Sequence, residues 1–224
     1  MRLIWVLAAL LLVAVGCSTA SPSSAGDAEP SPTGQTEASA SDNRETLVLP
    51  LSLYALVGDG SSGSPLAISS DRTADDLDVI AGNMANIWAQ ADISFSPVNT
   101  AVLTVPDDVL LAIGRGLDTD PFLAAAGSNF DVPSPGIVNG FYVREAAGVN
   151  GFAPTGRRIF FVVDEPSVHD ERVSSHEVGH IFGLHHDLNN PGRLMFSGTN
   201  GTTLRPEEQA VARYIAQGLL DGAR

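Results

Sequence analysis

Four of the five histidines in this sequence of 224 residues lie between positions 173 and 187. His176 and His180 are four positions apart. On a helix this spacing places them on the same face, where both imidazoles can bind one zinc ion. Glu177 follows the first of them and can reach the open side of such a metal without binding it, which suits a general base. The segment therefore predicts metal-assisted hydrolysis.

A third ligand follows the expected helix. Gly183 can adopt a positive φ, which would end the helix and turn the chain back toward the metal, so that His186 can bind it as well. Three protein ligands leave a fourth position for water, as in catalytic rather than structural zinc sites. The sequence therefore predicts one catalytic Zn²⁺ bound by His176, His180 and His186. The alternative, unrelated histidines on an acidic helix, requires Gly183 and His186 to match the pattern by chance.

The string from His176 to Asp187, HExxHxxGxxHD, resembles the metzincin zinc peptidases, in which a methionine turn follows the third histidine. Met195, nine residues after His186, is the candidate for that turn. The resemblance implies a methionine that packs beneath the zinc, and an Asp187 that lies beside the ligands without binding metal. An aspartate directly after the third histidine, here Asp187, is similar to the adamalysin branch. The short spacing from His186 to Met195 is more similar to that of the matrixins. We therefore expect a zinc metalloendopeptidase of no assigned subfamily.

The resemblance also indicates where a peptide substrate binds. Residues 148–154 look like the edge strand that precedes the zinc helix in this family, with Gly151, Phe152 and Ala153 as the candidates for pairing with an extended peptide or protein substrate. Residues 196–203 are expected to form the wall of the pocket beyond the scissile bond. The alternative is that residues 148–154 form only a mobile surface loop.

Hydrophobic patterns place these residues in an α/β domain with helices packed on a twisted sheet. By resemblance this is a metzincin-type zincin, with a mostly parallel sheet, an antiparallel edge strand, an active-site helix and a C-terminal helix. We expect strands over residues 47–57, 93–98, 137–145 and 158–164. We expect helices over residues 73–90, 107–113, 171–183 and 206–220, and a loop over 114–136.

The first residues are typical of a bacterial lipoprotein. Arg2 precedes an apolar run that ends in small residues before Cys17, the only cysteine. We therefore expect a signal peptide over residues 1–16 and a lipid on Cys17. Residues 17–45, which are rich in Ser, Pro and Ala, are expected to be a disordered tether, and residues 46–224 the catalytic domain. This predicts a domain in the bacterial cell envelope outside the cytoplasm, or a secreted one if Cys17 carries no lipid.

Composition excludes several other functions. The net charge is −14, and all 12 basic residues are arginines. We therefore expect no nucleic-acid partner and contact with a membrane only through the N-terminal lipid, because both nucleic acid and anionic lipid require a basic surface. The absence of lysine from the sequence excludes a Schiff-base mechanism. We expect a monomer.

The sequence also suggests a calcium site, a role for His185 and two alternative functions. Calcium could bind oxygen ligands from acidic residues, and the candidates are Asp118, Asp120, Asp164 and Glu165. His185 lies outside the ligand pattern and is expected to line the cleft or to be solvated rather than to bind zinc. The chain could instead be a degenerate metzincin-fold module that binds a peptide or an envelope component, or a zinc hydrolase of a non-peptide substrate. The intact Glu177 favours a catalyst over the binding module.

Overall fold

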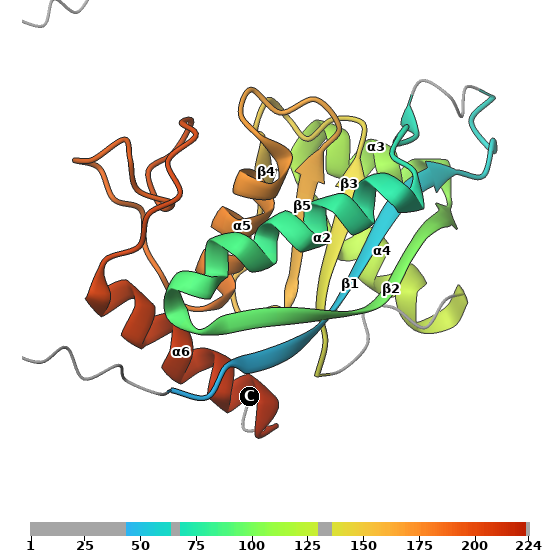
Figure 1. Cartoon of the computed structure of the whole chain (residues 1–224). Helices are drawn as coiled ribbons and strands as arrows, with labels where there is room; N and C mark the ends of the chain where they lie inside the picture. Colours follow the sequence, from blue (N-terminus) through green and yellow to red (C-terminus); the bar gives the residue numbers. More distant parts are fainter. Residues whose placement is uncertain (1–43, 64–67, 130–135, 223–224) are drawn as a thin grey trace, which may run out of the picture. The chain divides into compact units, whose positions relative to one another are not determined.

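The computed structural model describes residues 44–63, 68–129 and 136–222 (Figure 1). The expected signal peptide, Cys17 and nearly all of the expected tether lie outside the described residues. Among the described residues, no helix combines the length and the apolar character that crossing a membrane requires.

A five-stranded sheet organises the described residues, in the order β2-β1-β3-β5-β4. Neighbouring strands are parallel from β2 through β1 and β3 to β5, whereas β4 is antiparallel to β5 at the edge. The predicted mostly parallel sheet with an antiparallel edge strand is therefore confirmed. The strands are β1 (Leu47–Gly58), β2 (Ile93–Val105), β3 (Val138–Val143), β4 (Gly151–Phe152) and β5 (Ile159–Val163).

Helices cover both faces of the sheet because both faces are apolar. Alternate side chains of β1 point to opposite faces: Leu53 joins the core under α2, α5 and α6, whereas Leu56 joins the core under α3 and α4. Figure 1 shows α2 running across the first of these faces beside α5. The helices are α2 (Ala74–Trp88), α3 (Asp107–Gly116), α4 (Asp120–Asn129), α5 (Asp170–Ile181) and α6 (Pro206–Leu220), with a short 3₁₀ turn η1 (Ala89–Ala91) after α2.

Two sequence expectations were wrong. Residues 114–136 were expected to form a loop, but α4 occupies part of this segment. Its Ala-rich sequence has no regular apolar stripe, and Phe122, fully buried, packs edge-on against Phe141. Strand β2 continues well past the expected end at Val98, because the chain bulges there: Leu51 pairs with Pro97 and Ser52 with Asn99. A proline is tolerated at a bulge on an edge strand because no ladder hydrogen bond is lost there.

Candidate metal centre

Three histidines converge at one end of α5. His176 and His180 lie on this helix, and their Nε2 atoms are 3.2 Å and 3.1 Å from Nε2 of His186. Gly183, with φ of 79°, turns the chain after the helix, as the sequence predicted. Among the described residues, these histidines are the group of His, Cys, Asp or Glu side chains placed to hold a metal ion.

The hydrogen bonds of these rings fit a metal. Nδ1 of His176 donates to the carbonyl of Leu194 at 2.8 Å, and Nδ1 of His180 donates to the carbonyl of Leu184 at 3.0 Å. Because a carbonyl only accepts, both rings carry their hydrogen on Nδ1 and direct an Nε2 lone pair at His186. A tetrahedral zinc with Zn–N bonds of about 2.0–2.1 Å separates its nitrogen ligands by about 3.3 Å. The donor set therefore fits Zn²⁺.

Burial sets the protonation of the residues on α5. It lowers the pKa of His176 to about 3, so this imidazole is neutral at neutral pH, as a metal ligand must be. It raises the pKa of Glu177 to about 8, and the nearby Arg172 guanidinium opposes this rise. Glu177 is 5% exposed and lines the same cavity as the three histidines. A carboxyl group whose pKa lies near neutral pH can both accept and return a proton.

Met195, the candidate for the methionine turn, packs against α5. It is fully buried, and a Cβ built on Gly179 would lie 2.5 Å from its Sδ. Gly179 stands between the two helical histidines in the sequence. The glycine therefore lets the methionine turn pack against the side of α5 that carries the ligands.

Arg172 is a site residue that sequence analysis missed. It is buried on α5, one turn before His176, and its Nη2 donates to the carbonyls of Leu194, at 2.7 Å, and Phe196. Its Nε donates to the carbonyl of Gly201 at 3.3 Å. Arg172 thus ties the segment around Met195 to α5. Its position four residues before His176, on the same helix face, was the one available signal.

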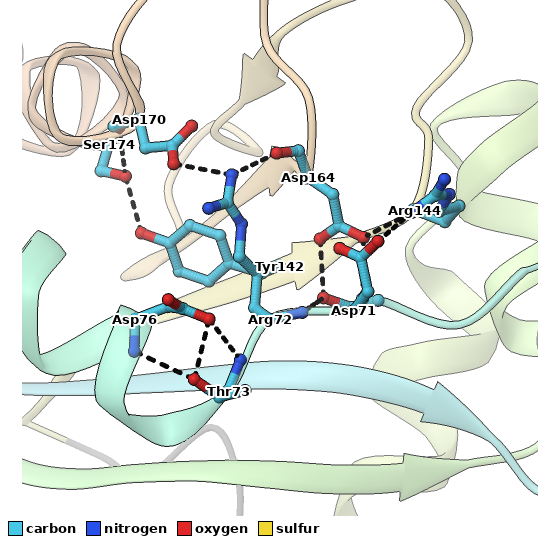
Figure 2. A network of polar contacts seen from close by, with 10 residues as sticks. Asp71, Arg72, Thr73, Asp76, Tyr142, Arg144, Asp164, Asp170 and Ser174 are labelled. Carbon is cyan, nitrogen blue, oxygen red and sulfur yellow. Dashed lines mark hydrogen bonds and ion pairs between the residues drawn. The ribbon is translucent and has the colours of Figure 1, made fainter.

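A polar network holds the first turn of α5 against the sheet (Figure 2). Arg72, just before α2, pairs with Asp170 at 2.6 Å and also donates to the main-chain carbonyl of Asp164. The buried hydroxyl of Tyr142 on β3 lies 2.7 Å from Oγ of Ser174. These contacts fix the helix that carries the histidines at a defined position on the sheet.

The same network involves one of the calcium candidates. The carboxylate of Asp164 accepts from Oγ of Ser70 at 2.6 Å and from the amide of Asp71 at 3.0 Å. Arg144 lies 3.7 Å from the same carboxylate, and burial raises the pKa of Asp164. Asp164 thus has a structural role. The candidates Asp118, Asp120 and Glu165 are exposed, and Asp118 Oδ1 accepts from the amide of Asp120 at 3.0 Å.

Asp187 organises the loop after the third histidine. Its Oδ1 accepts from the amides of Asn189, at 2.8 Å, and Asn190, at 3.3 Å, and these bonds lower its pKa. Its own amide donates to the carbonyl of Met195 at 3.0 Å. Asp187 therefore holds the His186 segment and the Met195 segment together through the main chain. His185 is exposed and lines a separate cavity that borders His180.

A groove of about 430 Å³ lies beside the histidines and is bounded by β4. The predicted substrate residues Gly151, Phe152 and Ala153 line it, together with Ser197 and Gly198 from the segment after Met195. Gly151 is required here because a Cβ at this position would lie 2.8 Å from the Phe161 carbonyl oxygen.

No protein-family model matches this sequence, and no curated protein matches it. Its fold is similar to archaemetzincin from Methanopyrus kandleri, with 13% identity and a TM-score of 0.51 over 78% of this chain and 99% of that one. Metalloproteinase-II from Bacteroides fragilis matches at 12% identity and a TM-score of 0.46, over 76% of this chain and 53% of that one.

A chain from a chaperone–substrate complex matches at 14% identity and a TM-score of 0.47, over 80% of this chain. This chain spans only 35% of the length of that one. At these identities the similarity concerns the fold alone, and the archaemetzincin match has a TM-score of 0.51. It shows that this chain has the α/β fold of the zincin-like metallopeptidases.

Proposed function

We propose that this chain is a zinc-dependent endopeptidase of the metzincin type, which hydrolyses peptide bonds in extended segments of protein substrates. The observation that carries the proposal is the convergence of three histidine Nε2 atoms, two of them fixed as lone-pair donors by carbonyl hydrogen bonds. The zincin-like fold and the buried carboxylate of Glu177 beside the cluster support it.

His176, His180 and His186 would hold the metal. When bound, zinc would act as a Lewis acid: it would polarise the scissile carbonyl and lower the pKa of a bound water. Glu177 then accepts a proton from the attacking water and delivers it to the leaving amine. Arg172 and Asp187 keep the ligand-bearing segments in register, since both bond the main chain around Met195.

Strand β4 offers a place for the substrate. The amide of Val163 donates to the carbonyl of Asn150 at 3.0 Å, and Gly151 is the next residue along β4, opposite Val162. In an antiparallel ladder, bonded and unbonded positions alternate, so the N–H and C=O of Gly151 point away from β5. They are therefore free to pair with an extended peptide, by the β-augmentation used by other peptide-binding proteins.

The N-terminal sequence supports a location for this activity. We propose that Cys17 carries a lipid and that the domain acts as a monomer outside the cytoplasm, held at the cell envelope by a tether. The proposal rests on the small residues before Cys17 and on the polar, aromatic-free sequence that follows. Labelling of cells with a radioactive fatty acid should mark the protein and fail to mark Cys17→Ser.

Zinc dependence is the first test of the peptidase. The purified protein is stripped with a chelator, titrated with zinc and incubated with an unfolded protein. We expect cleavage to rise with zinc and to saturate at one equivalent, and to be absent at every zinc level in His186→Ala. If the zinc-loaded protein binds the unfolded chain without cutting it, the chain is a binding module. If it hydrolyses only esters or other non-peptide substrates, the assigned substrate is wrong.

A further inference from the structure

A second cavity, of about 610 Å³, borders the metal centre. It shares Ala153 and His180 with the groove along β4. The main chain lines the groove with residues 149–153 and then lines the second cavity with residues 153–158. A peptide that follows β4 past the histidines therefore runs from one cavity into the other.

The second cavity combines an apolar floor with a basic rim. Leu184 and Leu219 are buried in the floor, from the end of the zinc-helix segment and from α6. Arg157 and Arg158 lie on the rim, in the loop between β4 and β5, and Arg157 is exposed. Such a lining fits a peptide segment that has an apolar side chain next to an acidic one.

These two arginines differ from others in the chain. Within the part of the chain that the structure describes, no carboxylate lies within ion-pair distance of Arg157 or Arg158. Several other arginines are neutralised by acidic residues of the chain itself: Arg72, Arg144, Arg205 and Arg213. In a protein of net charge −14, two adjacent arginines with no carboxylate partner among the described residues form a local positive site in a negative surface. They are available to a carboxylate supplied by a ligand.

We propose that the second cavity is a specificity subsite that selects substrates with an acidic side chain on one side of the scissile bond, through Arg157 and Arg158, with a neighbouring apolar side chain on the Leu184–Leu219 floor. This rests on the proposed peptidase function, and it adds the substrate class. The strong negative charge of the rest of the protein disfavours nucleic acid and anionic membranes as occupants. A peptide with an acidic side chain can bind despite this charge. Its main chain pairs with β4, and its acidic side chain meets Arg157 and Arg158.

A binding experiment tests the subsite without requiring turnover. The zinc-loaded Glu177→Gln variant is titrated with three fluorescent peptides that differ only in one residue beside a leucine: Glu, Gln or Lys. We expect the Glu peptide to bind about three- to tenfold more tightly than the Gln peptide, since exposed charge pairs each contribute modestly. Adding Arg157→Glu and Arg158→Glu should remove this preference and favour the Lys peptide.

Arg115→Glu is the control for a charge reversal remote from the rim. Arg115 is exposed on α3 and does not line either of these cavities, so its reversal changes the net charge without changing the rim. We expect the Glu preference to survive in this variant. A preference lost equally in Arg115→Glu would overturn the subsite by showing that the overall charge matters. A preference kept in the rim double variant would overturn it by showing that Arg157 and Arg158 do not create the preference.

Cleavage of the same peptides by the wild-type protein separates the two proposals. Cleavage with an acidic preference on one side of the bond, lost in the rim double variant, supports both. Cleavage without such a preference overturns the subsite and leaves the peptidase intact. Charge-dependent binding without any cleavage supports the subsite as a peptide-binding site and overturns the peptidase.

Discussion

Met195 and Gly179 pack against each other with no space for a side chain between them. A Cβ on Gly179 would lie 2.5 Å from Sδ and 3.1 Å from Cε of the methionine, which is fully buried. The contact joins the middle of α5 to the turn that follows His186. The position of His186 relative to His176 and His180 therefore depends on a glycine that is not itself a candidate metal ligand.

This contact predicts that Gly179→Ala is destabilising. Alanine favours a helix over glycine by about 1 kcal/mol, but overpacking a buried site costs about 1–3 kcal/mol, and the clash is with a methionine held on all sides. We expect a net loss of about 1 kcal/mol in the free energy of unfolding, together with weaker zinc binding. Urea unfolding and metal titration measure the two effects.

Gly82→Ala is the control for this change. Gly82 is an exposed residue of α2, and a Cβ there meets no atom within 4 Å. The same substitution should stabilise the protein by about 0.5–1 kcal/mol and leave zinc binding unchanged. Equal stabilisation of both variants would show that Met195 moves aside at no cost.

The ligand set predicts how zinc content responds to loss of each histidine. His186→Ala should lose the metal because two imidazoles from one helix do not complete the site. His185→Ala and His169→Ala should keep one equivalent, since neither side chain joins the cluster. Metal analysis of the purified variants decides this. Loss of zinc in His185→Ala with retention in His186→Ala would reassign the third ligand.

The edge strand can be tested at Asn150. Its side chain donates to Oγ of Ser167 at 2.8 Å and accepts from the Ser167 amide at 3.0 Å, which fixes the start of β4. Asn150→Ala removes both bonds, each worth about 1 kcal/mol, so β4 loosens. We expect KM for peptides to rise roughly threefold to tenfold, with zinc content unchanged.

Ser167→Ala is the graded partner of this change. It removes the Ser167 hydroxyl but keeps the Ser167 amide, which still donates to the side chain of Asn150. Its effect on KM should therefore be smaller than that of Asn150→Ala. An unchanged KM in Asn150→Ala would show that β4 does not position the substrate. A proline at Gly151 would be a poorer test, because its Cβ would collide with the main chain of Phe161 and with Val173.

Asp107 predicts part of the acid sensitivity of the fold. Hydrogen bonds from the side chain and amide of Ser62, and from the amide of Gly60, lower the pKa of this carboxylate below its ordinary value of 3.8. Between this lowered pKa and the ordinary value of 3.8, the folded state therefore binds fewer protons than the unfolded state. The stability that Asp107 contributes is present above pH 3.8 and is lost as the pH falls through its folded pKa.

Urea unfolding as a function of pH measures this contribution. Asp107→Asn should lower stability near neutral pH and flatten its decline in acid. Ser62→Ala, which keeps the amide donor, should have an intermediate effect. If the stability of Asp107→Asn declines as steeply in acid as that of the parent, the Asp107 contacts with the 60–62 loop do not stabilise the folded state.

Sequence patterns sufficed for the elements with strong periodicity or a clear cap. The start of α2 was predicted from Thr73 and the acidic residues after it, and Thr73 and Asp76 do form a reciprocal capping box. The three histidines were predicted to meet for two reasons. Helical spacing places His176 and His180 on one face, and a turn at Gly183 brings His186 back toward that face. The turn at Met195 was predicted only by resemblance, since a single methionine has no signature of its own.

The features that were missed depend on contacts between distant residues. Helix α4 is held by Phe122 among aromatic rings of β3 and β5 rather than by an amphipathic stripe. The role of Arg172 depends on carbonyls more than twenty residues away in the sequence. The basic rim of the second cavity depends on α6 closing the floor, and nothing near Arg157 in the sequence indicates this.

The most direct test of the central claim is a comparison of Glu177→Gln with the wild-type protein at equal zinc content. Peptide cleavage, bound zinc and melting temperature are measured on the same preparations. We predict one zinc per chain and a near-normal melting temperature in both, with kcat/KM lower in the variant by roughly 10²–10⁴-fold, the usual contribution of a positioned general base. Turnover close to that of the wild type in a zinc-loaded Glu177→Gln preparation would contradict it.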